Sequence, residues 1–390
     1  MKITSVELAT IEHPLPPGEP LSGKAQRPAW PSQIEVANPM SRFPKFKSRR
    51  HLYQAKRWPA FGVKVVAEDG TWGIGTTSGR PVAAVIEDAF AHILVGEECT
   101  AIEKLWDMMF RASKPFGTVG ISSIAISAVD LALWDLVGKL KNKPVYELIG
   151  GPTRENVFVY ATGNDVDWYQ ELGFSAFKLP CQYGPADGLW GLDQNEKIVA
   201  ETRKRIGDHA ELMLDCYMAF DVDYTVRLAE RLRPYRLKWI EEFLIPEDVA
   251  GHIAVRERLP WMTLAGGEHL YTHFPFQQMI EHRCLDILQP DIHWAGGLTA
   301  CIKICHMAEA PGLQVILHGG GNDPYGQHLT WAMPNIPWGE YFVGSDPGIP
   351  LSNASYPNAV IPSDSFLPNP PTGPGFGLDI SENQLHPFNW

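Results

Sequence analysis

The chain has 390 residues and a formal net charge of -12, with 45% hydrophobic and 20% charged residues. This length exceeds one compact domain, and an α/β barrel of about 250 residues would leave room for a second unit. The acidic balance disfavours nucleic acid or an anionic membrane as partner, because both bind concentrated basic surfaces. The sequence contains no run of 18 or more apolar residues, which is about the length that a membrane-spanning helix needs.

Features of the N-terminus and the cysteines bear on the compartment. The opening MKITSVELATIEHPLPP has no uninterrupted apolar segment or small-residue cleavage site, so no secretory signal is expected. The six cysteines show neither zinc-site spacing nor a dense disulfide framework, and we interpret them as reduced, mostly buried thiols. Together these observations predict a cytoplasmic protein.

Residues 1–125 predict a small α+β domain that would cap the rest. An alternating stretch comes first, and FGVKVVAEDG and TWGIGTTSG then predict a hairpin that turns at Asp69-Gly70, followed by helical patterns. Residues 15–60 are Pro-rich without a clear period and predict a long substrate-covering loop, and a loop of this length in a compact protein is usually either functional or disordered. Its basic residues fit either a solvated loop or a cap that attracts a small anionic substrate: Arg42, Lys45, Lys47, Arg49, Arg50, Lys56 and Arg57.

Residues 126–365 predict a parallel α/β barrel. Before it, ISSIAISAVDLALWDLVGKLKN predicts one long, largely apolar helix. Amphipathic helical stretches such as QNEKIVAETRKRIG separate most of the strand candidates, and alternating β and α elements close into a parallel barrel. The tail, residues 366–390, is rich in Pro and Gly and is expected to run back to the cap. The strand candidates are VFVYATG, SAFKLP, ELMLDCY, LKWIEEF, MTLAGGE, LDILQPD, QVILHGG and GEYFVG.

Six titratable residues close successive strand candidates at intervals of 22 to 27 residues: Asp215, Glu241, Glu268, Asp291, His318 and Glu340. The interval is that of one βα unit, and the C-terminal ends of barrel strands face one mouth. Residues far apart in the chain are therefore expected to meet in one pocket.

The three acids Asp215, Glu241 and Glu268 predict one divalent cation site. Clustered carboxylates repel one another unless a cation intervenes, and an all-oxygen set favours Mg²⁺. Taken singly, each acid would more often be a surface or salt-bridged residue. Strand alternation leaves open whether Glu241 or Glu242 points into the pocket.

Asp291 and His318 predict a general base with its orienting carboxylate. A carboxylate on one ring nitrogen fixes the imidazole tautomer and leaves the other nitrogen free to take a proton. A structural histidine is the alternative. Glu340 could make a supporting hydrogen bond or a rim salt bridge, and His269 could reach substrate hydroxyls. Lys178 occupies a place for a barrel base, but Pro180 stands where a second lysine would point the same way.

Several motifs in this order resemble the enolase superfamily, in particular its mandelate racemase-like subgroup and, within it, the rhamnonate dehydratase family. The similarity covers nearly the whole chain and rests on SAVDLALWDLVGK, LMLDCYM, LKWIEE, GGEH, QPDIHWAGGLT, LHG and the cap segment ANPMSRFPKFKSR. The resemblance implies a modified TIM barrel, (β/α)₇β, beneath an N-terminal α+β capping domain. It also implies a Mg²⁺-dependent dehydratase of an acid sugar, with one Mg²⁺ per subunit and a homo-oligomeric assembly.

The same resemblance implies roles for individual residues. It selects Glu241 over Glu242 as a metal ligand beside Asp215 and Glu268, and it assigns acid/base work to His318 with Asp291 and a supporting hydrogen bond to Glu340. Substrate contacts would come from Lys178, His269 and Arg50, with Arg49 as a close rival. The chain departs from the family in lacking a histidine before the PMS motif, and it lacks the Lys-x-Lys pair of many superfamily members.

Alternative functions remain open at this point. A racemase or epimerase on the same scaffold is the nearest, although Lys178-Leu179-Pro180 argues against two bases. A barrel glycoside hydrolase could use Glu241 and Glu268 as its acid and nucleophile, and it would not respond to a chelator. A non-catalytic sugar-acid binding protein would have no need of the Asp291 and His318 pair.

Overall fold

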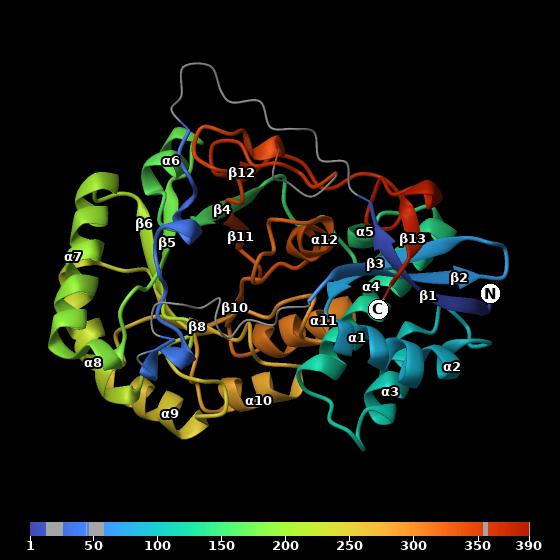
Figure 1. The fold of residues 1–390 in the computed structure, drawn as a ribbon, viewed down its shortest axis with the longest axis horizontal. Helices are drawn as coiled ribbons and strands as arrows, with labels where there is room; N and C mark the ends of the chain where they lie inside the picture. The colour runs from blue at the N-terminus through green and yellow to red at the C-terminus, as the bar shows by residue number, and fades with distance from the viewer. Residues whose placement is uncertain (13–25, 44, 47–57, 354–357, 390) are drawn as a thin grey trace.

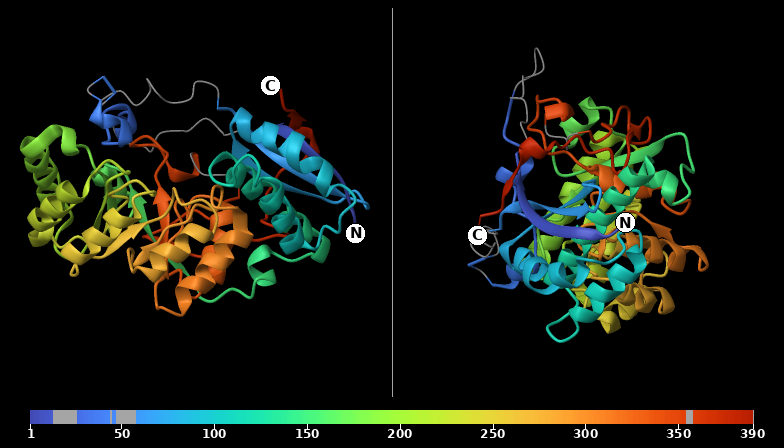
Figure 2. Two further views of the ribbon diagram at one scale, coloured as in Figure 1. Left: turned by 90° about the horizontal axis from the view of Figure 1, so that it is seen from below. Right: turned by 90° about the vertical axis from the view of Figure 1, so that its right-hand side faces the viewer.

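The structure is a computed structural model that describes residues 1–12, 26–43, 45–46, 58–353 and 358–389. It contains a four-stranded antiparallel sheet and a nine-stranded, mostly parallel curled sheet. Figure 1 shows the curled sheet ringed by helices, and Figure 2 shows the antiparallel sheet with its own helices at one end of an elongated molecule. The predicted fold class, a barrel with an α+β cap, is confirmed.

The cap sheet has the order β13-β1-β2-β3 and is built from both ends of the chain. β2 (Ala60–Ala67) and β3 (Trp72–Ser78) form the predicted hairpin, and Gly70 supplies the positive φ of 83° that its turn needs. β1 (Ile3–Ile11) pairs with β2 on one side and with β13 (Leu385–Pro387) on the other. The C-terminal residues therefore return to the cap.

One long helix, α4 (Ile121–Lys141), lies between the cap sheet and the barrel. Gly73 and Gly75 let β3 approach it directly, because a Cβ at either position would lie about 2 Å from a carbonyl oxygen of α4. On its other face Asp130 accepts hydrogen bonds from the Thr299 backbone N–H (3.0 Å) and hydroxyl (2.5 Å). By length and composition α4 could span a membrane, but 83% of its apolar window is buried inside the fold.

The remaining cap helices pack beside α4 around one apolar core. The predicted boundary between residues 125 and 126 falls inside α4, whose residues belong to that core, and the division into domains stays a prediction. The short helices of the cap are α1 (Arg80–Ala84), the π-helical η4 (Val85–Phe90), α2 (Ala91–Leu94) and α3 (Ile102–Ala112).

All eight predicted barrel strands are present, and their ladder runs β10-β9-β8-β7-β6-β5-β4-β11. Within the described residues no ladder joins β10 to β11, but the Gly321 N–H after β10 donates to the Glu340 carbonyl of β11 at 2.7 Å. The strands are β4 (Val157–Thr162), β5 (Ala176–Pro180), β6 (Glu211–Asp215), β7 (Ile240–Glu241), β8 (Leu264–Gly266), β9 (Ile287–Leu288), β10 (Gln314–Val315) and β11 (Trp338–Phe342).

A helix follows each of the first seven strands, which gives the (β/α)₇β order. Apolar side chains fill the space inside the strands, among them Tyr160, Met213 and Trp239, while a larger core lies between strands and helices. The helices are α6 (Val166–Glu171), α7 (Gly188–Ile206), α8 (Val222–Leu232), α9 (Val249–Arg258), α10 (Phe274–Glu281), α11 (Gly297–Glu309) and α12 (Pro324–Ala332).

Part of the predicted covering loop lies over the barrel. The Trp30 backbone N–H donates to Asp165 at the start of α6 (2.8 Å), and the Ala37 N–H donates to the Cys181 carbonyl after β5 (2.9 Å). Two short 3-10 turns, η1 (Trp30–Ser32) and η2 (Pro39–Arg42), lie in this part of the loop. Hydrogen bonds thus hold the described part of the loop against the ends of two barrel strands.

Candidate active site

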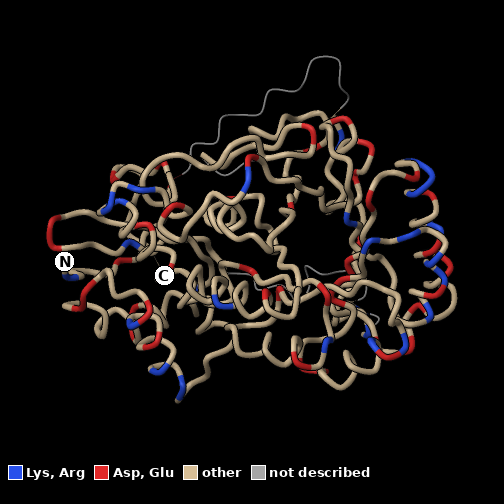
Figure 3. Tube along the Cα trace, turned by 180° about the vertical axis from the view of Figure 1, so that it is seen from behind, with Lys and Arg blue, Asp and Glu red and all other residues tan. Residues whose placement is uncertain are grey.

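The titratable residues predicted from the strand spacing do meet at one end of the barrel. Asp215 and Glu241 are register partners at the ends of β6 and β7, and Glu268 follows β8 by two residues. Figure 3 shows acidic positions on segments around the barrel centre, whereas many Lys and Arg positions lie on outer helices such as α7. The strand ends therefore concentrate negative charge in a largely buried region.

His318 and Asp291 form the expected hydrogen-bonded pair. His318 Nδ1 lies 2.7 Å from Asp291 Oδ2, and the other carboxylate oxygen accepts the His293 backbone N–H at 2.6 Å. His318 Nε2 lies 3.7 Å from Glu268. Burial alone would lower the pKa of His318, but the charge of Glu268 and the hydrogen bond to Asp291 raise it well above its usual value.

Lys178 holds the carboxylates of two strands together. Its ammonium contacts Glu241 and lies 2.7 Å from Glu340, and all three side chains are almost fully buried. Glu340 also accepts the Thr162 hydroxyl (2.5 Å) and the Gly319 N–H (2.9 Å). Burial opposes the ionised form, but the charge of Lys178 lowers the pKa of Glu340 to about 2. Glu340 therefore stays ionised.

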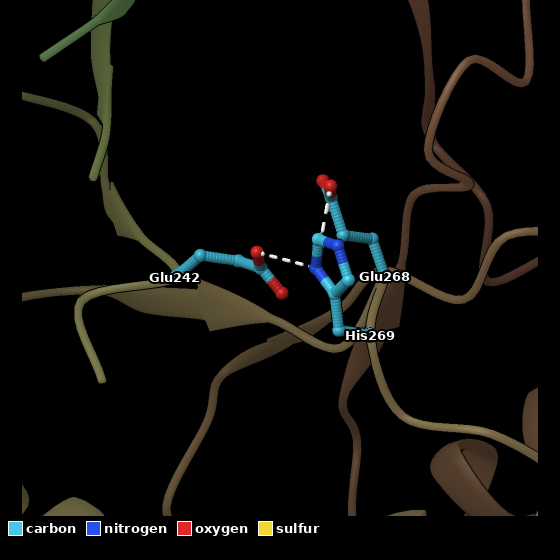
Figure 4. A group of neighbouring side chains, drawn as sticks. All are labelled: Glu242, Glu268 and His269. Carbon is cyan, nitrogen blue, oxygen red and sulfur yellow. Dashed lines mark hydrogen bonds and ion pairs between the residues drawn. The ribbon is translucent and has the colours of Figure 1, made fainter. Parts of the chain in front are cut away.

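A second group of side chains converges beside these pairs. Figure 4 shows Glu242 and His269 pointing toward one another, with Glu268 beside the ring. His269 Nδ1 lies 2.8 Å from Glu242 and 3.5 Å from Glu268. Among the described residues, this is the group whose metal-ligand atoms all lie within 4.8 Å of one another. Glu241 is outside it, because its carboxylate is bound by Lys178, Trp239 and Gln289.

The donor set fits a hard divalent cation. Burial raises the pKa of Asp215 to about 6 and that of Glu268 to about 7, and it raises the pKa of Glu242 well above its usual value. In each case neighbouring carboxylates add to the shift. Ionised carboxylates at this density need a positive partner, and their oxygens suit Mg²⁺. Which of Glu241 and Glu242 would serve as ligand stays a prediction.

A cavity of about 750 Å³ opens between the cap and the barrel. Its barrel side includes His269, Asp291 and Trp294, and the rings of His269 and His318 lie 5.5 and 5.2 Å from that of Trp294. Its cap side is formed by β2, β3 and neighbouring residues: Trp58, Ala60, Phe61, Thr76, Thr77 and Ser78. Asp291 of the predicted acid/base pair therefore borders a space large enough for a small acid, and the His318 ring lies beside the lining residue Trp294.

Some predicted residues are placed and others are not. Arg49 and Arg50 lie outside the described residues, so their predicted contacts with substrate stay predictions. His269 lines the cavity, whereas Lys178 is 1% exposed and held by carboxylates. Sequence reasoning passed over Trp294 and the side chain of His293, although both stand within three residues of Asp291.

Known proteins place this architecture in a family. Residues 50–150 match the N-terminal domain of mandelate racemase and muconate lactonizing enzyme, and residues 164–384 match the enolase C-terminal domain-like family. The L-rhamnonate dehydratase of Saccharopolyspora erythraea is 39% identical over 351 residues, which are 89% of each chain.

Solved structures agree with the sequence comparison. The rhamnonate dehydratase of Gibberella zeae complexed with Mg superposes with a TM-score of 0.87 at 31% identity, covering 99% of this chain and 96% of that one. A racemase from Streptomyces coelicolor with bound magnesium superposes with a TM-score of 0.77 at 26% identity, covering 98% of both chains. The chain belongs to the enolase superfamily, with the two domains of mandelate racemase and muconate lactonizing enzyme.

Proposed function

We propose that this protein is a Mg²⁺-dependent L-rhamnonate dehydratase, a hydro-lyase. It would remove the C2 proton and the 3-hydroxyl of the sugar acid to give a 2-keto-3-deoxy acid. The relative from Saccharopolyspora erythraea with the same activity in its name supports this substrate, at 39% identity over most of both chains. The Mg-complexed relative from Gibberella zeae supports the cofactor.

The observation that carries the proposal is the hydrogen-bonded pair of His318 and Asp291 beside buried carboxylates. With Nδ1 held at 2.7 Å by Asp291, the imidazole presents Nε2 on the side of Glu268. A cation bound at Glu268 would offset the charge that most raises the pKa of His318, and the neutral ring can then take a proton from the carbon next to a carboxylate. The negative charge of Asp291 stabilises the imidazolium that results.

One histidine can serve both halves of the reaction. His318 Nε2 takes the C2 proton, and the electron pair of the broken C–H bond moves toward the substrate carboxylate. The imidazolium then donates that proton to the departing 3-hydroxyl, which leaves as water, and the enol product tautomerises to the keto acid. Since one side chain acts on one face of the substrate, the elimination is syn.

For the cation, we assign Asp215, Glu241 and Glu268 as ligands, with Glu242 as the rival of Glu241. Bound Mg²⁺ supplies positive charge that offsets the charge developing on the substrate carboxylate, an effect worth several kcal/mol in a preorganised site. Glu340 would make a supporting hydrogen bond, Lys178 would contact the substrate, and His269 would contact a hydroxyl. Arg50, or Arg49 in its place, would reach the distal groups from the cap.

Formation of a keto acid from an aldonate library tests the proposal, with L-rhamnonate, L-lyxonate and L-mannonate first. We expect dehydration of L-rhamnonate that requires Mg²⁺ and stops with chelator. The racemase rival is tested in D₂O, where it would exchange the C2 hydrogen of recovered substrate and form no keto acid. Chelator-insensitive activity on a glycoside would instead support a hydrolase.

We also propose a cytoplasmic location and a homo-oligomeric assembly. All six cysteines are free and buried, which suits a reducing compartment. Phe116, Val119 and Ile121 expose apolar surface before and at the start of α4, and such surface suits a contact between subunits. Light scattering of the purified protein measures the number of subunits.

A further inference from the structure

His293 links the cap sheet, the barrel and the acid/base pair. Its Nε2 lies 2.9 Å from Asp323 Oδ2 at the start of α12, and its Nδ1 lies 3.3 Å from the Thr76 carbonyl on β3. Its backbone N–H donates to Asp291 Oδ1 at 2.6 Å. One residue thus touches the cap, the helix after β10 and the carboxylate that orients His318.

The side-chain contacts fit a charged imidazole. Both ring nitrogens face acceptors, which only the protonated ring can satisfy as a double donor. Burial would lower the pKa of His293, but Asp323 and then Asp291 raise it to about 9. Asp323 is held in turn, because its other oxygen accepts the Gly326 N–H (3.0 Å) as the N-cap of α12. The ion pair between His293 and Asp323 is therefore anchored at the N-terminus of α12.

A second link runs beside the first. The Tyr325 hydroxyl, from the first turn of α12, donates to the Ile74 carbonyl on β3 at 3.0 Å. Its ring meets that of His293 edge to face, with centroids 5.4 Å apart. Tyr325 ties the same helix to the same strand through its hydroxyl, whereas the hydrogen bond to Asp291 Oδ1 comes from the backbone of His293, so the two links can be separated by mutation.

We propose that His293 is a positioning residue that docks the cap strand β3 on the barrel and, through its backbone N–H, sets the orientation of Asp291 for His318. The inference rests on the proposed function for its effect on turnover. Docking itself is independent of the reaction. When the ion pair with Asp323 is lost, the imidazole that contacts the Thr76 carbonyl of β3 loses its anchor on α12, which weakens that link to the cap and frees the side chain on the loop carrying Asp291.

The test compares Asp323→Asn, His293→Gln and the control Tyr325→Phe by hydrogen exchange of the β3 amides and by steady-state kinetics. Asn keeps an N-cap acceptor for α12 but removes the charge, so the helix is preserved. We expect faster β3 exchange in all three variants. We expect kcat to fall about tenfold in the first two, with KM within about twofold, because a misplaced catalytic group slows turnover more than binding. Tyr325→Phe should keep the kcat of the wild type.

Two results overturn the inference. One is unchanged β3 exchange in both Asp323→Asn and His293→Gln. The other is an equal kcat in these variants and in Tyr325→Phe, which would reduce His293 to a structural residue. If one of the two variants fails to fold, the other decides. If no aldonate is dehydrated while β3 exchange rises as expected, the proposed function fails and the docking role stands.

Discussion

The cap and the barrel line one cavity with different kinds of side chain. Among the described lining residues, both sides supply aromatic rings, but the imidazoles and the carboxylate of His269, His293 and Asp291 come from the barrel, whereas the Ser and Thr hydroxyls come from β3 of the cap. The titratable groups follow the ends of short strands held on both sides by neighbours. With the proposed function, this difference predicts that substitutions in the barrel change mainly proton transfer, whereas substitutions in the cap change mainly substrate binding.

The largest effect is expected on the barrel side of the comparison. Replacing His318 by Asn keeps a polar side chain but removes the proton acceptor, and we expect kcat to fall by about 10³-fold. Keto-acid formation measures the loss, and circular dichroism checks the fold. More than a few per cent of wild-type turnover in a folded variant contradicts the assigned role.

A second experiment on the barrel tests which of two adjacent acids, Glu241 or Glu242, binds Mg²⁺. If Glu241 is a ligand, Glu241→Gln weakens Mg²⁺ binding by about 100-fold or more, while Glu242→Gln has the smaller effect. Isothermal titration calorimetry measures the affinity of each variant without substrate. The reverse order would assign the site to the cluster of Glu242, Glu268 and His269.

On the cap side a smaller effect is expected. Ser78→Ala removes one hydroxyl that lines the cavity, and a lost hydrogen bond of about 1 kcal/mol raises KM about fivefold. We expect kcat to stay the same, because Ser78 has no part in the proposed proton transfer by His318 and Asp291. A large drop in kcat at unchanged KM would break the separation between cap and barrel.

The smallest effect concerns the junction of the two regions. The pKa of His293 is raised from 6.5 to about 9 in the folded protein, so the stabilisation by its charge is complete below about pH 6.5 and is lost as pH rises through about 9. The melting temperatures of wild type and Asp323→Asn should therefore differ most near pH 6 and converge near pH 10. A difference independent of pH contradicts the ion pair.

Much of the architecture was predictable because hydrophobic periodicity reports on strands and helices directly. The eight barrel strands, the β2 and β3 hairpin and the long apolar helix α4 all occur where the patterns predicted them. The cap boundary was harder to place, since α4 is apolar on the face toward the cap sheet and on the face toward α11. The hydrophobic pattern of a helix that is buried on two sides does not tell to which domain the helix belongs.

The site divides in the same way. The spacing along the chain predicted that six residues meet at one mouth of the barrel, because the C-terminal ends of barrel strands lie on one side. They are Asp215, Glu241, Glu268, Asp291, His318 and Glu340. The spacing could not tell Glu241 from Glu242, both of which are buried and engaged. The sequence also could not predict the contacts of His293, since its partners Thr76 and Asp323 lie in other elements.

The sequence by itself determined the order of the strands, the residues at their ends and hence the chemistry available at the mouth. Only the tertiary structure decided which carboxylates pair with Lys178 and which with His269, and how the cap strand meets the barrel. The physical reason is that strand and helix periods are local properties of the chain. Ion pairs and hydrogen bonds between distant residues depend on where the packed elements bring them.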